Sequence, residues 1–163
     1  MYHIGDFVVK TNEGVCKIKD IKSLDISGVP KDKLYLFLVP VENPTVCVYL
    51  PADGAENALR QVITEEDAVK LLDSIPDIKV MQITDEKRRE KEYKDAVSRG
   101  DPYQLASVIK TIYKRKIDRE NQGKKNGSVD ERYFKIAEDR LLSELALVMK
   151  KTKEEIKNII LHK

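Results

Sequence analysis

Phosphate-binding chemistry is concentrated in residues 87–125, which hold thirteen Lys and Arg side chains against six Asp and Glu. This is a local excess of seven positive charges in a chain whose net charge is only +2. A local positive field attracts phosphate groups, whereas a small net charge mainly affects solubility. Seven of these side chains are our candidate DNA contacts: Arg88, Arg89, Lys91, Lys94, Lys110, Lys114 and Arg115.

Two predicted helices must carry these cations. The first runs from about residue 85 to residue 99 and is ended by Gly100, and the second begins at Asp101-Pro102, an N-cap acceptor followed by proline. Apolar residues in the second helix recur at i, i+3, i+4, i+7 and i+8, which predicts one buried face. These residues are Leu105, Val108, Ile109, Ile112 and Tyr113. The tight corner between the helices could bring both sets of cations to one surface, although basic helix faces are often simply solvated.

Catalytic chemistry has little support in the sequence. The two histidines, His3 and His162, lie at opposite ends of the chain, which argues against a histidine triad or a zinc site. No glycine-rich loop of the phosphate-binding type is present, and acidic pairs such as Glu65-Glu66 lie at predicted helix starts, where they favour the helix dipole. We therefore expect neither an enzyme nor a metal or other cofactor.

The first fifty residues favour β structure. Short apolar or alternating runs are separated by turns rich in glycine, proline and asparagine, which predicts a small, strongly bent barrel. The expected strands cover residues 4–9, 14–21, 34–39 and 46–50. Residues 52–62 read as a connector with one helical turn.

The rest of the chain favours helices. A helix opens at Thr64 and stops at Pro76, and residues 76–84 read as a linker that contains the domain boundary. Two further capping boxes are predicted, at Ser128-x-x-Glu131 and Thr152-x-x-Glu155. We therefore expect an α+β chain of two domains, a small bent β-barrel followed by an all-α helical bundle. The expected division is 1–62 for the barrel, 63–83 for a helix and linker, and 84–163 for the helical domain.

The two cysteines, Cys16 and Cys47, lie in strand-like runs without metal-ligand spacing. Reduced thiols in a cytosolic protein are expected, with a single bridge between them as the alternative. No signal peptide and no apolar run of membrane length is recognisable. We expect a monomer in the cytoplasm, associated with the nucleoid.

Ordered motifs in both halves are similar to one family of bacterial transcription regulators, CarD/CdnL. In the first half the segments that carry the resemblance are Ile4-Gly5-Asp6-x-Val8-Val9, Glu13-Gly14-Val15, Pro51-Ala52-Asp53 and Arg60-Gln61-Val62-Ile63. In the second half they are Arg88-Arg89-x-Lys91, Ser98-Arg99-Gly100-Asp101, Val108-Ile109-x-x-Ile112-Tyr113-Lys114-Arg115 and Ser143-Glu144-Leu145-Ala146-Leu147. Each segment alone is weak, but their ordered combination is specific.

The resemblance implies a function for each domain. The barrel would be a Tudor-like domain, shared with transcription-repair coupling factors, that binds the RNA polymerase β subunit by placing an edge strand beside a strand of the partner. The matching strand here would be Val46, Cys47, Val48, Tyr49 and Leu50. The helical domain would contact promoter DNA, without sequence readout, at the upstream edge of the melted region.

One position departs from the family pattern. Relatives carry a tryptophan shortly before the Arg-Arg pair, and this tryptophan wedges into the minor groove. By register from Gly100, this chain has Glu86 at that position and no tryptophan at all.

The residues also allow a second function, a protein–protein adaptor whose helical bundle binds an acidic partner and never touches DNA.

Overall fold

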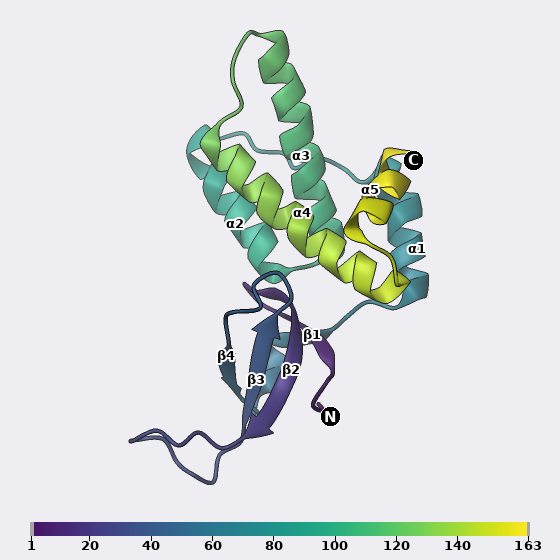
Figure 1. Ribbon diagram of the computed structural model, residues 1–163. Coiled ribbons are helices and arrows are strands. Elements are labelled where there is room, and N and C mark those ends of the chain that lie inside the picture. The colour runs from purple at the N-terminus through teal and green to yellow at the C-terminus, as the bar shows by residue number, and fades with distance from the viewer. Residues whose placement is uncertain (1, 163) are drawn as a thin grey trace. The chain divides into compact units, whose positions relative to one another are not determined.

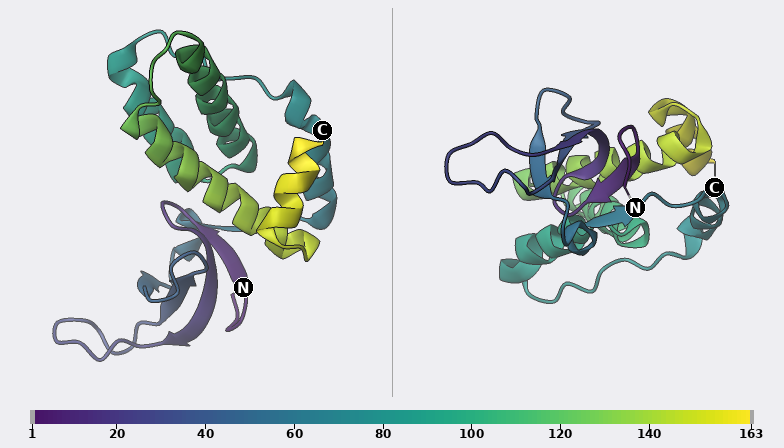
Figure 2. Two further views of the ribbon diagram at one scale, coloured as in Figure 1. Left: turned by 45° about the horizontal axis from the view of Figure 1, so that its top comes forward. Right: turned by 90° about the horizontal axis from the view of Figure 1, so that it is seen from below.

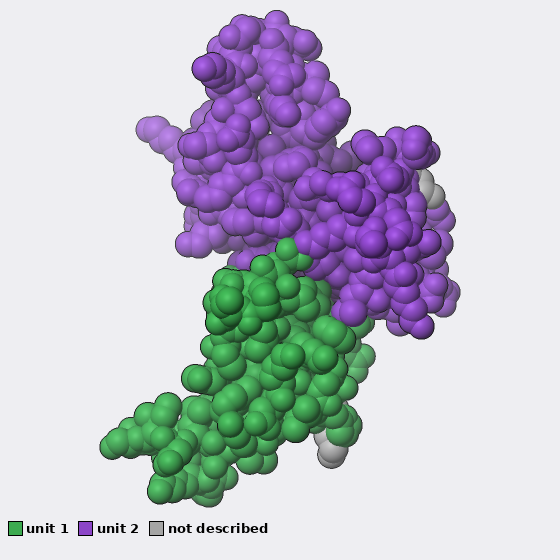
Figure 3. Space-filling model, viewed as in Figure 1, with its two compact units in different colours: residues 1–62 green, residues 63–163 purple. Residues whose placement is uncertain are grey.

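The computed structural model describes residues 2–162 and divides the chain into two compact units (Figure 3). Residues 1–62 form a β-rich unit, called the front unit below, and residues 63–163 form a helical unit. The front unit is a curled half-barrel and the helical unit is built from α-helices (Figure 1). The expected α+β architecture, a bent β domain followed by a helical domain, is confirmed.

One antiparallel sheet forms the front unit, with the strand order β4-β3-β2-β1-β5. Its strands are β1 (Phe7–Lys10), β2 (Gly14–Lys22), β3 (Tyr35–Pro40), β4 (Val48–Pro51) and β5 (Leu59–Gln61). A 3-10 turn, η1 (Ala55–Asn57), precedes β5. The strands β4 and β5 are therefore the two edges of the sheet.

The curl of the sheet follows from one extra residue in β2. Ile18 pairs with Leu38 and Asp20 pairs with Phe37, so Lys19 has no counterpart on β3. Such a bulge bends a strand and increases its twist, and β2 is visibly curved along its length (Figure 2). Its inward side chains, Cys16 and Ile18 among them, are fully buried and form a small core.

Two details of the front unit differ from the sequence prediction. The fourth strand begins at Val48 rather than at residue 46, because the Val46 N–H donates to the Asn43 carbonyl in a turn, and pairing with β3 begins only at Val48. The strand β5 was not predicted, because three residues are too few to show alternation; it is defined by its pairing with β1.

Five α-helices lie in the described part of the helical unit. They are α1 (Glu65–Ser74), α2 (Arg89–Arg99), α3 (Pro102–Asn121), α4 (Ser128–Met149) and α5 (Lys153–Leu161). Two 3-10 turns, η2 (Ile75–Asp77) and η3 (Glu86–Arg88), follow α1 and precede α2. α3 and α4 pack against each other, and α1 and α5 lie beside the C-terminal part of α4 (Figures 1 and 2).

Most of the predicted helix ends are confirmed. Asp101 caps α3 by accepting from the Tyr103 N–H, and Thr152 caps α5 in a capping box with Glu155. Gly100 ends α2 with φ of 73°, a left-handed conformation that glycine adopts without strain. The capping box predicted at Ser128 is wrong. α4 starts at Ser128 itself, with Gly127 as its N-cap, so the Ser128 side chain lies inside the first turn and caps nothing.

Residues 63–83 belong to the helical unit rather than forming a linker. Ala68, Leu71 and Leu72 of α1 are buried in the helical core. The following segment is hydrogen-bonded to α3: the Ser107 hydroxyl donates to the Lys79 carbonyl, and the Met81 N–H donates to the Thr111 hydroxyl. The change between units therefore falls between residues 62 and 63.

The buried face of α3 is narrower than its sequence predicts. Leu105, Val108 and Ile112 are buried, whereas Tyr113 is 57% exposed. Tyr113 ends a run of i, i+3, i+4, i+7 and i+8, and eight residues of a 3.6-residue helix carry the side chain 80° past the starting position. The prediction that Tyr113 is a core residue is wrong.

Candidate nucleic-acid interface

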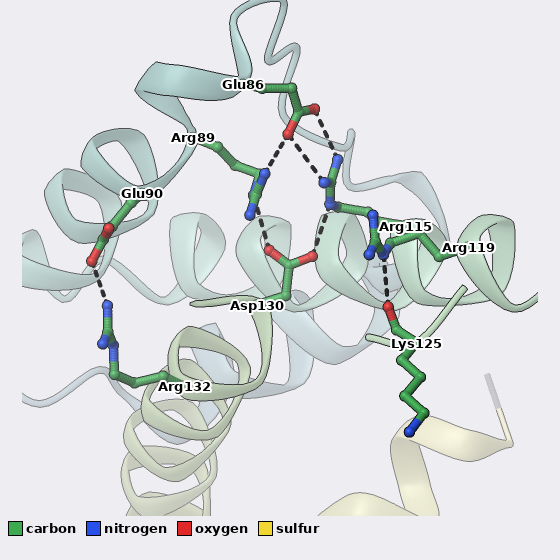
Figure 4. Close-up of polar contacts among 8 residues, drawn as sticks. All are labelled: Glu86, Arg89, Glu90, Arg115, Arg119, Lys125, Asp130 and Arg132. Atoms are coloured by element: carbon green, nitrogen blue, oxygen red, sulfur yellow. Dashed lines mark hydrogen bonds and ion pairs between the residues drawn. The ribbon is translucent and has the colours of Figure 1, made fainter. Parts of the chain in front are cut away.

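Four charged side chains form an ionic cluster that joins the starts of α2 and α4 to the C-terminal half of α3 (Figure 4). Arg115 donates from Nε to Asp130 Oδ2 at 2.8 Å and from Nη1 to Glu86 Oε1 at 3.0 Å. Arg89 donates from Nε to Asp130 Oδ1 at 3.1 Å and from Nη1 to the Glu86 carboxylate. Two guanidinium groups and two carboxylates thus alternate around a closed ring, called the ionic ring below.

The centre of the ionic ring is buried. Asp130 is only 1% exposed, because it lies on the same side of α4 as Tyr133 and Ala137, three and seven residues later, which face the helical core. A buried carboxylate is unfavourable unless it is paired and hydrogen-bonded. Asp130 therefore requires both arginines, and both arginines are held in place by it.

The ionic ring shifts the ionisation of its neighbours. A hydrogen bond from Arg115 is the main cause that lowers the pKa of Glu86 below its ordinary value, and the Arg89 guanidinium acts in the same direction. Burial raises the pKa of Tyr93 to about 12, and the negative charge of Asp130 adds to the effect. At neutral pH, Glu86 is charged and Tyr93 is neutral.

Lys110 is also occupied within the protein. Its Nζ donates to the carbonyl oxygens of Ile75 at 2.8 Å, Pro76 at 3.3 Å and Ile78 at 2.6 Å. These carbonyls lie where α1 ends and η2 turns away, and helix C-termini leave carbonyl groups without helical partners. Lys110 supplies the hydrogen-bond donor that these carbonyls lack, so its structural role is to hold this turn against α3.

The seven candidate DNA contacts therefore fall into three groups. Arg89, Arg115 and Lys110 are brought against carboxylates or carbonyls of the protein. Lys91 is exposed and pairs with Asp95 at 3.2 Å on the surface of α2, an arrangement that contributes little to stability. Three candidates are exposed and have no side-chain partner among residues 2–162. These are Arg88, Lys94 and Lys114.

Glu86, at the position expected for a wedge, is turned toward Arg89 and Arg115 (Figure 4). Its side chain is 63% exposed, and its charge is balanced by the two guanidinium groups. It is thus the exposed member of the ionic ring, and its carboxylate is committed to holding η3 against α3.

Further cations that our candidate set omitted lie beside the ionic ring. Arg119 and Lys124 line a groove together with Lys114 and Arg115. Arg119 donates from Nε to the Lys125 carbonyl at 3.0 Å, which folds the loop after α3 back onto that helix (Figure 4). The spacing of Lys114 and Arg119 on one helix gives no hint of this, because the fold of the loop brings Lys124 to them.

The residues expected to bind polymerase lie at and before one edge of the front unit. β4 pairs with β3 and has no second partner strand among residues 2–162. Val48, Tyr49 and Leu50 belong to this edge strand, whereas Val46 and Cys47 lie in the preceding loop. Val48 and Leu50 turn toward the core, and Tyr49 is 50% exposed with its ring 4.7 Å from that of Phe37.

Groups of metal-ligand type are not gathered anywhere in residues 2–162. Both cysteines are free thiols, Cys16 in the core of the front unit and Cys47 on its surface. Among the described helices, none has the length and apolar character needed to cross a bilayer. The helical unit offers two kinds of cation, those paired within the protein and those exposed on its surface.

Comparison with protein-family models gives two matches that cover most of the chain. Residues 2–63 match the model described as the CarD-like/TRCF RID domain, and residues 70–161 match the model described as the CarD C-terminal domain. A search of curated proteins found no match to the chain.

Proposed function

Since the two family models together span nearly all of it, the chain belongs to the CarD family, and we propose that it is a transcription regulator that binds the RNA polymerase β subunit and promoter DNA together. CarD family domains are interaction domains without catalytic function, and the RID domain interacts with RNA polymerase. The proposed function assigns polymerase to the front unit and DNA to the helical unit.

The observation that carries the polymerase assignment is the free edge of β4. An edge strand presents unpaired backbone N–H and C=O groups, and a partner strand can add to it by main-chain hydrogen bonds. The side chains next to this edge suit a protein contact, because the Phe37 and Tyr49 rings pack together at a tilted angle and Lys22 lies over the Phe37 ring at 4.8 Å. Aromatic side chains are enriched in protein interfaces.

The DNA assignment is supported by the separation of the cations into fixed and free groups. The ionic ring fixes η3, α2 and α3 through Arg89 and Arg115. Arg88 is the last residue of η3, next to Arg89 in the chain, and its side chain is exposed. Lys94 on α2 and Lys114 on α3 are exposed as well. Cations held on a rigid frame, free to contact phosphates, bind DNA without reading its sequence.

Binding to both partners would act on promoter melting by mass action. A protein that makes more contacts with the open complex than with the closed complex shifts the population toward the open complex by its difference in affinity. With Glu86 at the wedge position, this difference would come from phosphate contacts rather than from an inserted ring.

A salt titration tests the proposal and separates it from an adaptor that never touches DNA. Affinity of the full chain for a promoter duplex should fall by roughly 0.9 log units per log unit of salt for each phosphate contacted. Binding to the isolated β subunit, which depends on backbone pairing, should be less sensitive to salt. Binding to the β subunit without measurable DNA affinity at low salt would favour the adaptor.

A further inference from the structure

A groove lies within the helical unit. It has a volume of about 620 Å³ and is bounded by residues 80–83, the starts of η3 and α2, and the C-terminal half of α3. This volume lies within the range that small-molecule sites occupy in proteins. Its lining includes the apolar residues Val80, Met81 and Ile83, together with residues of α3 and of the loop that follows it.

The charge that lines the groove is positive once the ionic ring is counted as neutral. Arg89 and Arg115 line the groove but are balanced by Glu86 and Asp130. Outside the ionic ring, the lining has three cations, Lys114, Arg119 and Lys124, against one carboxylate, Asp118. The remaining charge is therefore two positive units in a concave site, where the field is stronger than on a flat surface.

The fold positions these cations rather than leaving them on separate mobile segments. The Lys124 N–H donates to the Arg119 carbonyl at 2.8 Å, and Arg119 Nε donates to the Lys125 carbonyl at 3.0 Å. These two bonds hold Lys124 against the end of α3. The two terminal nitrogens of Arg119 have no partner among the described residues, so both can donate to one phosphate as a bidentate pair.

Tyr93 is among the residues that line the groove, but it is fully buried and lies beside Asp130. It therefore supports the ionic ring from within the protein, and the polar contacts open to a ligand are those of the exposed cations.

We propose that this groove binds a small ligand carrying two or more phosphoryl groups, held by Lys114, Arg119 and Lys124. The apolar residues Val80, Met81 and Ile83 would receive an organic ring, so the favoured ligand class is a nucleoside polyphosphate. The inference goes beyond the proposed function, since it requires neither polymerase nor DNA.

Isothermal titration calorimetry of the full chain tests the site directly. The probes are tripolyphosphate and a nucleoside triphosphate, at physiological salt. Lys114→Ala with Lys124→Ala removes two groove cations, whereas Lys116→Ala with Lys125→Ala removes two exposed lysines from the same helix and loop outside the groove. We expect one bound probe per chain, an affinity loss of at least tenfold in the first pair, and a change of less than twofold in the second.

Three results would overturn the proposal. The first is absence of binding by the wild-type chain at millimolar probe. The second is an equal loss in both double variants, which would indicate diffuse attraction. Lys114 is also a proposed DNA contact, so the third test uses Lys124, which is not: a loss of duplex affinity in Lys124→Ala as large as its loss of probe affinity would assign the whole groove to the DNA interface. Thermal unfolding of each variant establishes that the helical unit is intact.

Discussion

Arg115 Nε lies 2.8 Å from Asp130 Oδ2, and Asp130 is almost completely shielded from solvent. The same carboxylate accepts from Arg89 through its other oxygen, so one acidic side chain of α4 holds cations from both α2 and α3. Two arginines from a basic stretch are thereby used to assemble the helices, and the exposed cations beside them are left for a ligand.

Asp130→Asn should destabilise the helical unit strongly. The substitution leaves two guanidinium groups beside a neutral amide in a poorly hydrated site, and breaking a buried pair in this way costs about 3–5 kcal/mol. Asp118→Asn, at an exposed carboxylate of α3, should change the free energy of unfolding by no more than about 0.5 kcal/mol. Urea denaturation followed by circular dichroism measures both. Equal stability of the two variants would contradict the role of the ionic ring.

The contribution of Glu86 should depend on pH in a defined direction. Because the pKa of Glu86 is lowered in the folded state, its carboxylate stabilises the fold above its ordinary pKa of 4.5, and this contribution is lost as the pH falls through the lowered value. The difference in unfolding free energy between wild type and Glu86→Gln should thus be largest near pH 7 and vanish in acid. A difference that stays constant from pH 7 to pH 3 would argue against this coupling.

Lys110→Met should loosen the segment after α1. The substitution keeps the long side chain and removes the donor to three carbonyls, with an expected loss of about 1–3 kcal/mol. Hydrogen exchange should show faster exchange at the amides of Ile78 and Met81, which are hydrogen-bonded in this region. Lys116→Met, on the exposed side of the same helix, provides the control and should leave these amides protected.

Tyr49→Glu should weaken binding to the polymerase β subunit by roughly tenfold, since aromatic residues at the centre of interfaces often carry much of the binding energy. Tyr49 is exposed on the edge strand, so the sheet should tolerate the change. Ile26→Glu replaces another exposed apolar side chain of the front unit, in the loop between β2 and β3, and should leave binding unchanged. Surface plasmon resonance with immobilised β subunit compares them, and equal affinities would remove Tyr49 from the interface.

Most features of the fold that depend on neighbouring residues were predictable from the sequence, the capping box expected at Ser128 being the exception. Asp101-Pro102 and Thr152-x-x-Glu155 mark helix starts because a cap is formed within four residues. The glycine at position 100 marks a helix end for the same reason. The strand β5 was missed because its definition depends on β1, about fifty residues earlier in the chain.

The division of the cations could not be predicted from their own spacing. Arg115 and Arg89 are 15 and 41 residues from Asp130 in the chain, so their pairing depends on helix packing. One signal was available, because Asp130 lies at i, i+3 and i+7 with Tyr133 and Ala137 on the face that α4 buries. A charged residue on an apolar face needs a partner of opposite charge. The Lys and Arg side chains of residues 87–125 were the obvious candidates.

The structure also changes how the DNA contacts should be tested. Arg89→Glu would place a third carboxylate beside Glu86 and Asp130, so a loss of activity could come from unfolding. Arg88 and Lys94 are exposed and unpartnered among the described residues, and they can be reversed in charge without touching the ionic ring. Lys135→Glu with Lys151→Glu gives a charge-matched control on α4 and just after it.

The lifetime of open promoter complexes, measured with cognate RNA polymerase after addition of a competitor, tests the central claim most directly. Wild-type protein should change this lifetime, and Arg88→Glu with Lys94→Glu should remove most of that effect while affinity for the β subunit stays within twofold. The control pair, Lys135→Glu with Lys151→Glu, should act like wild type. If the Arg88 and Lys94 variant retains the full effect on lifetime, or loses binding to the β subunit as well, the assignment of DNA to the helical unit and polymerase to the front unit is contradicted.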